Sequence, residues 1–155
     1  MERVAAEYYQ KALRNFRIAD HLLMKTYKFV QDPKLLLTVI ENLFLAMGAG
    51  MSSILAHEYH HKRIPPPGST FDAKVDAMRM YIVRRHNLRP EDITVAQELK
   101  NIVLAHKKSP VEFVRNGCFV ICGENYQLQP VGANQVERYH RRAKIFIDQI
   151  GTIIQ

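Results

Sequence analysis

Residues 33–61 read PKLLLTVIENLFLAMGAGMSSILAHEYHH and carry an apolar line with helical spacing. Its members recur every three or four positions, which predicts one long helix with a buried face: Leu36, Ile40, Leu43, Met47, Met51 and Ile54. The uncharged part, residues 43–56, is 14 residues long and contains two glycines and two serines. Because that part is too short and too polar to cross a bilayer, we expect the core helix of a protein with no membrane contact.

The segment before this helix predicts a partner for it. Residues 2–30 contain neither proline nor glycine, and apolar side chains recur there with helical spacing from Val4 to Tyr27. Asp32-Pro33 ends this first helix and starts the next, because proline fits the first turn of a helix. A link this short makes the two helices antiparallel neighbours.

The segment after it adds three helices and a hairpin. Pro65 to Gly68 break the chain, a third helix is predicted over 69–86, and a fourth opens at Pro90. Asn116-Gly117 between two β-prone runs predicts a hairpin around residues 111–128. A last helix is predicted from Asn134, with Glu137 completing a capping box. The expected fold is mainly α: an up-down bundle of four long helices plus a C-terminal helix, with a small β-hairpin.

Length and composition favour one soluble domain over residues 1–155. The chain has 155 residues, 47% of them hydrophobic and 24% charged, which is ordinary globular usage. Two cysteines do not make a disulfide framework, and acids near the N-terminus argue against a signal peptide. We therefore expect a cytoplasmic protein.

The run His57-Glu58-Tyr59-His60-His61 matches the zinc-protease pattern H-E-x-x-H, in which two histidines share a metal and the glutamate activates water. Such a protease needs a third ligand further along the chain, and the helix is expected to break directly after the motif. The alternative is a solvated, histidine-rich helix end. We therefore do not expect a protease.

A second metal pattern pairs Glu58-x-x-His61 with Glu137-x-x-His140. Two E-x-x-H motifs with lone glutamates from other helices form the di-metal site of ferritin-like bundles. Both motifs, however, fall at predicted helix ends, and Glu137 is already assigned to a cap. We expect no metal and no cofactor, and keep these four residues as the alternative.

The bundle pattern, the chain length and the pair Arg79 and His86 together resemble the HEPN family (higher eukaryotes and prokaryotes nucleotide-binding domains). The resemblance covers about residues 1–107. It implies a small, dimeric helical bundle, and many members are toxins or RNases with an arginine and a histidine near the end of a late helix. It implies phosphate binding by Arg79 and general acid/base catalysis by His86. Met80 departs from the polar residue that often follows the arginine.

The spacing of that pair has a physical consequence if the third helix reaches His86. Residues seven apart on a helix return to one face within about 20°. Arg79 and His86 would then both reach one phosphate, and a two-fold axis would bring two such pairs together. The alternative is that His86, with Arg84 and Arg85, forms an exposed helix end.

Positive charge is concentrated in the second half of the chain. The formal net charge is +7, and residues 79–155 hold 12 basic and 7 acidic residues. Clusters of basic side chains can attract nucleic acid, and the rings of Tyr126 and Tyr139 could add surface on which bases stack. The residues that we assign to a nucleic-acid interface are Arg84, Arg85, Arg138, Arg141, Arg142 and Lys144. The alternative is a solvated basic face.

The sequence therefore favours a HEPN-like, homodimeric binding protein for nucleic acid or nucleotide rather than an enzyme. Three alternatives stay open: a metal-independent RNase that uses Arg79 and His86 at a dimer cleft, a di-metal carboxylate bundle, and a structural subunit without a site. Gly48 and Gly50 lie in the middle of the long helix and predict a close helix contact, within the chain or across the dimer.

Overall fold

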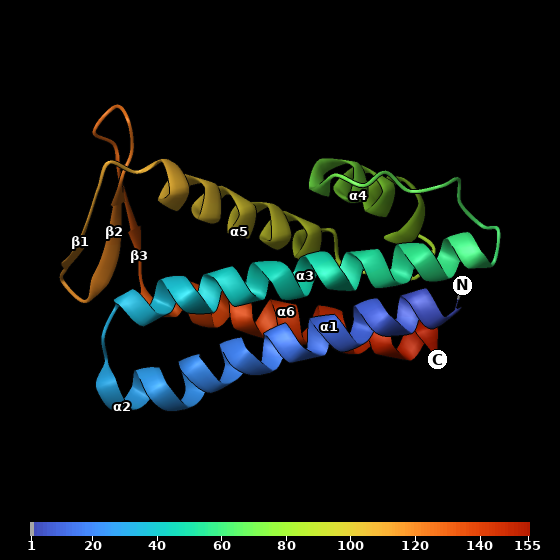
Figure 1. Cartoon of the computed structure of the whole chain (residues 1–155), viewed down its shortest axis with the longest axis horizontal. Coiled ribbons are helices and arrows are strands. Elements are labelled where there is room, and N and C mark those ends of the chain that lie inside the picture. Colours follow the sequence, from blue (N-terminus) through green and yellow to red (C-terminus); the bar gives the residue numbers. More distant parts are fainter. Residues whose placement is uncertain (1) are drawn as a thin grey trace.

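A computed structural model describes residues 2–155, and most of them are helical (Figure 1). The first helical rod covers residues 2–30 as predicted. It consists of α1 (Glu2–His21), the π-helical turn η1 (Leu22–Tyr27) and α2 (Lys28–Val30). Gln31, with a φ of +57°, ends the rod in the left-handed region.

The long helix α3 (Lys34–His60) runs antiparallel to α1, so the start of α1 lies beside the end of α3 (Figure 1). Ala5, Ala12 and Ala19 are buried in α1, which allows the two helices to pack closely. Ser53 of α3 donates a buried hydrogen bond of 2.7 Å to the carbonyl of Ala5. These contacts fix the position of the start of α1 relative to the end of α3.

The third helix is shorter than the sequence predicts. Thr70 caps α4 (Phe71–Ala77) by accepting from the amide of Ala73, and the π-helical turn η2 (Met78–Ile82) follows. The chain then leaves the helix, and Asn87 takes a φ of +53°. The predicted helix over 69–86 therefore stops before Arg84, and the bundle does not have a long third helix.

Helix α5 (Pro90–Lys108) crosses α3 and leads to a small antiparallel sheet with strand order β1-β2-β3 (Figure 1). The predicted hairpin is present as β1 (Val111–Arg115) and β2 (Cys118–Cys122). Asn116 and Gly117 have φ values of +52° and +75°, as a two-residue hairpin turn requires. Strand β3 (Leu128–Val131) pairs with β2 and was not predicted.

Helix α6 (Ala133–Ile154) returns along α3 and α1 and buries Tyr139, Phe146 and Ile150. The predicted cap at Asn134 is wrong, because the N-cap residue is Gly132 and no side chain caps this helix. Strand β3 ends at Val131, so the helix begins directly after one extended residue.

Helix α3 is the one helix among residues 2–155 that is long and apolar enough to span a membrane. Most of that apolar stretch is buried inside the molecule. Gly50 explains part of the burial, since a Cβ atom there would lie 3.1 Å from Cε2 of Phe146 on α6. At this glycine the predicted close contact lies within one chain.

Candidate functional site

Glu58 carries a fully buried carboxylate in the last turn of α3, and cationic side chains surround it. Its Oε2 accepts a hydrogen bond of 2.7 Å from Nη1 of Arg63, and its Oε1 bonds to Nε2 of His86. Nη1 of Arg85 lies 3.8 Å from the same Oε1. One buried acid thus gathers side chains from two loops that are more than twenty residues apart.

Two turns of similar geometry bring these side chains to Glu58. Lys62 has a φ of +59°, and the amides of Lys62 and Arg63 bond to the carbonyls of Tyr59 and Glu58. This is the Schellman arrangement that ends many helices, usually with glycine at the left-handed position. Asn87 holds the equivalent position after η2, where the amide of Leu88 bonds to the carbonyl of Val83.

The charge on Glu58 is stabilised by these partners. Burial by itself would raise the pKa of this carboxyl group. The hydrogen bonds from His86 and Arg63 outweigh burial, and the pKa of Glu58 is lowered from its usual value. The carboxylate of Glu58 is therefore ionised, and its negative charge attracts cations to this end of the molecule.

The partners of Glu58 lie in two segments of the chain, residues 62–63 and 84–89, that are rich in basic residues. We call the basic residues of these two segments the basic end: Lys62, Arg63, Arg84, Arg85, His86 and Arg89. The acids near this set are Glu58, Glu91, which lies 3.1 Å from Arg89, and the buried Asp92, on which the charge of Arg89 acts. The side chains of Arg63 and Arg85 are 46% and 42% exposed, so their guanidinium groups reach solvent while they touch Glu58.

The geometry separates Arg79 from His86. Arg79 donates through Nη2 to Oε1 of Gln97 on α5 at 2.7 Å, whereas His86 bonds to Glu58 on α3. The seven-residue helical spacing does not apply, because the helix ends at Ile82. Within residues 2–155, no contact joins the two side chains that the sequence pairs.

Most of the predicted C-terminal basic residues are paired with acids. Arg138 lies 3.1 Å from Glu98, Lys144 lies 2.8 Å from Asp148, and Arg142 lies 2.8 Å from Asp92. Arg141 is exposed and has no ion pair in the described part of the chain. Tyr139 is buried, so it offers no stacking surface, whereas Tyr126 is exposed.

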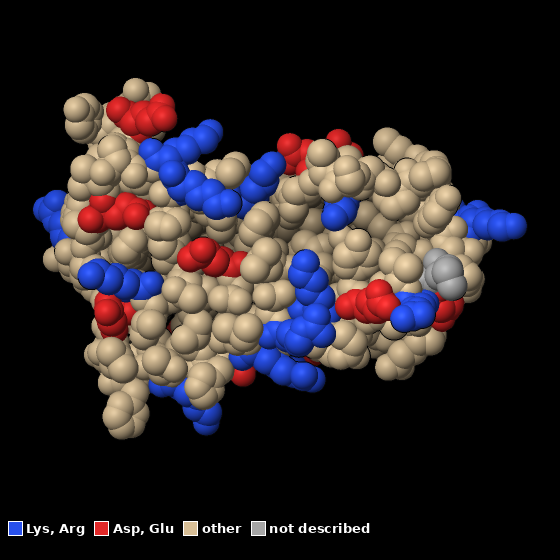
Figure 2. All heavy atoms as spheres, in the orientation of Figure 1, with Lys and Arg blue, Asp and Glu red and all other residues tan. Residues whose placement is uncertain are grey.

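The molecular surface does not present one continuous basic area on the face drawn in Figure 2. Lys and Arg side chains there alternate with Asp and Glu. Net charge alone therefore does not select an interface on this face. The contacts around Glu58 are a more specific indication than the total of +7.

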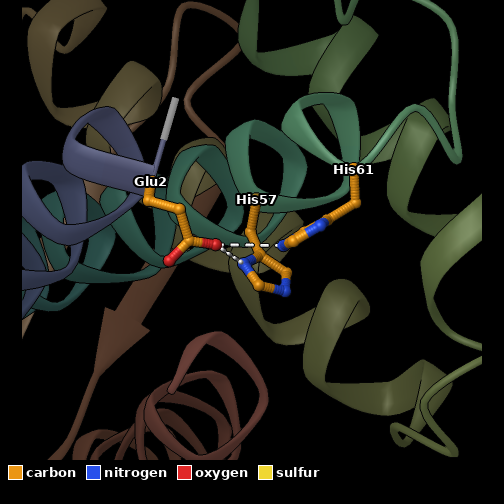
Figure 3. A group of neighbouring side chains, drawn as sticks. All are labelled: Glu2, His57 and His61. Atoms are coloured by element: carbon orange, nitrogen blue, oxygen red, sulfur yellow. Dashed lines mark hydrogen bonds and ion pairs between the residues drawn. The ribbon is translucent and has the colours of Figure 1, made fainter.

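The two E-x-x-H motifs are not brought together. Glu58 contacts the basic end, and His140 lies 2.8 Å from Asp20 and stacks on Phe16. Among residues 2–155, the one group of three or more side chains placed to hold a metal is Glu2, His57 and His61 (Figure 3). The H-E-x-x-H run therefore divides, since its two histidines face Glu2 while its glutamate faces the arginines.

Sequence reasoning missed Arg63 and Glu2. A signal for Glu2 was present, because two antiparallel helices joined by a short link place the start of the first beside the end of the second. No sequence pattern indicated a role for Arg63, because it follows the predicted end of the long helix and belongs to no motif. Comparison with protein-family models, with curated proteins and with solved structures gave no match.

Proposed function

We propose that this chain is a HEPN-like helical-bundle protein that binds the phosphate groups of nucleic acid or nucleotide through the basic end. The observation that carries the proposal is the buried carboxylate of Glu58, which holds Arg63, Arg85 and His86 side by side. Each guanidinium has five N–H donors, so one that bonds to Glu58 keeps donors free for a phosphate. A side chain that is already positioned loses less entropy when the ligand binds.

An adjacent hollow supports a ligand with a base as well as a phosphate. This hollow has a volume of about 500 Å³, and its lining includes Tyr8, Tyr59 and Pro66. Tyr59 belongs to the same last turn of α3 as Glu58, and its side chain is partly exposed. Aromatic rings of this kind stack on bases of single-stranded nucleic acid.

Binding of a fluorescently labelled single-stranded RNA at several salt concentrations tests the proposal. We expect the double variant Arg84→Ala, Arg85→Ala to bind more weakly. The slope of log affinity against log salt should also fall by about 0.7 for each phosphate contact that is lost. Arg63 and His86 still contact Glu58 in this variant, so the fold should persist.

The matched control is Lys107→Ala, Lys108→Ala, which removes two charges at the opposite end of α5. This control should keep the wild-type salt slope. Equal weakening in both variants would show that only net charge matters. Failure of the wild-type chain to bind at low salt would contradict the proposal outright.

RNA cleavage is a second candidate function, favoured by the contact between His86 and buried Glu58. A carboxylate that bonds to one ring nitrogen fixes the orientation of a histidine, and a fixed imidazole suits a general acid/base. In this arrangement Arg85, rather than Arg79, lies beside the histidine. The resemblance also implies a homodimer, so activity should rise with protein concentration through a dimerisation step.

His86→Ala should then abolish cleavage of single-stranded RNA in the presence of EDTA while most of the binding remains. Arg79→Ala, a change on the side of α5, serves as the control and should keep activity. Intact RNA after incubation with the wild-type chain would eliminate cleavage as a function and leave binding.

A further inference from the structure

Three potential metal ligands meet where the first turn of α1 lies against the last turns of α3 (Figure 3). Oε1 of Glu2 lies 3.5 Å from Nδ1 of His57 and 3.0 Å from Nε2 of His61. All three donor atoms lie within 4.8 Å of one another. The set combines two imidazoles with one carboxylate, which occurs at zinc sites that keep a fourth position for water.

The separations suit a tetrahedral ion. Ligand atoms that are each about 2.0 Å from zinc at tetrahedral angles lie about 3.3 Å from one another. The two distances to Glu2 fall on either side of that value. The two imidazole nitrogens need to approach by at most about 1.5 Å, a shift that rotation of the partly exposed His61 side chain can supply.

An unpartnered buried atom independently indicates a ligand. The side chain of His57 is only 9% exposed, yet its Nδ1 makes no hydrogen bond, since the 3.5 Å contact with Oε1 of Glu2 is an ion-pair distance only. A buried polar atom without a partner costs free energy, so it is uncommon in a folded protein. This nitrogen faces Glu2 and His61, which is the position from which it would bind an ion (Figure 3).

We propose that Glu2, His57 and His61 form a binding site for a divalent transition-metal ion, with zinc as the expected occupant. The ion joins the first turn of α1 to the last turns of α3. Glu58 is turned toward the basic end and is neutralised by its cations, so it is not placed to activate a metal-bound water as in a zinc protease. None of its ligands belongs to the basic end, so variants at the three ligands test metal binding separately from phosphate binding.

Titration with Co²⁺ tests the site, using protein prepared without a histidine tag. Cobalt in a tetrahedral nitrogen and oxygen site gives strong visible absorption, and we expect it to saturate at one ion per chain. Zinc should displace the cobalt and raise the melting temperature of the wild-type chain. Absence of both the absorption and the thermal shift would overturn the proposal.

Variants assign the ligands. Glu2→Gln changes a half-exposed side chain, so the fold should be unaffected, and affinity should fall more than about tenfold. His61→Ala should have a similar effect. His60→Ala is the matched control, because His60 lies on the same turn outside the group of three, and it should bind as the wild type does. If His60→Ala lost as much metal affinity as His61→Ala, or if Glu2→Gln lost none, the metal would be bound adventitiously by surface histidines.

Discussion

Arg142 lies against Asp92, whose side chain is fully buried, and the arginine itself is only 14% exposed. Nε of Arg142 donates to Oδ1 of Asp92 at 2.8 Å, while Oδ2 has no hydrogen-bond partner. The sequence assigned Arg142 to a nucleic-acid interface on charge alone. In the folded chain its guanidinium neutralises a buried acid, so charge in the sequence did not distinguish a surface group from a group that the core needs.

Arg142→Met should therefore destabilise the chain strongly. The change leaves a buried carboxylate without its cation, which costs about 3–5 kcal/mol in the free energy of unfolding. Urea denaturation measures this, with Lys144→Ala as the control, because the pair of Lys144 and Asp148 is exposed and should contribute little. Equal stability of Arg142→Met and the wild type would show that Asp92 is not a buried, ionised group.

The same pair predicts a dependence of stability on pH. Burial raises the pKa of Asp92 above its usual value, although Arg142 acts in the opposite direction. The folded state thus holds this proton more tightly than the unfolded state. The contribution of Asp92 to stability is fully present below the usual pKa of about 3.9 and is lost as the pH rises through the higher folded value.

Asp92→Asn removes this titration. The unfolding free energy of the wild type, measured relative to that of Asp92→Asn, should therefore decrease as the pH rises from about 4 toward neutrality. Parallel denaturation series at several pH values give this difference. A difference that increases with pH would mean that Arg142 lowers the folded pKa of Asp92 below the unfolded one.

At the scale of elements, the helical rod of residues 2–30, the long helix α3 and the hairpin at Asn116-Gly117 follow directly from periodicity and turn chemistry. The errors lie where tertiary contacts decide a boundary. The third helix stops at Ile82, where the contacts of His86 and Leu88 replace another helical turn. The start of α6 follows strand β3, whose pairing with β2 is not visible in local sequence.

The two central glycines of α3 give opposite predictions. A Cβ atom at Gly50 would lie 3.1 Å from Cε2 of Phe146, which is already a tight contact. Gly50→Leu should therefore lower the free energy of unfolding by about 1–3 kcal/mol through overpacking. A Cβ atom at Gly48 would meet nothing within 4 Å, so Gly48→Ala should gain up to about 1 kcal/mol in helix propensity. Thermal or urea denaturation compares the two, and a Gly50→Leu chain as stable as the wild type would contradict this packing.

At the scale of the whole molecule, the antiparallel packing of α1 on α3 brings Glu2 next to His57 and His61, and the loop after η2 brings His86 to Glu58. The sequence paired His57 with His61 by their spacing on one helix, and the fold keeps these two side chains together. It paired His86 with Arg79 and Glu58 with the second E-x-x-H motif, whereas the structure joins His86 to Glu58. Contacts between separate elements, such as those of Glu2 and His86, are specified only by the fold.

The proposed role of the basic end around Glu58 is to bind nucleic-acid phosphates. The most direct measurement follows backbone amide chemical shifts by NMR while single-stranded RNA is added to the wild-type chain. We predict the largest shifts in residues 58–63 and 83–89, and little change in Lys107, Lys108 and the sheet that follows them. Shifts confined to the sheet or to the exposed face of α6, or no shifts at low salt, would show that the basic end does not bind nucleic acid.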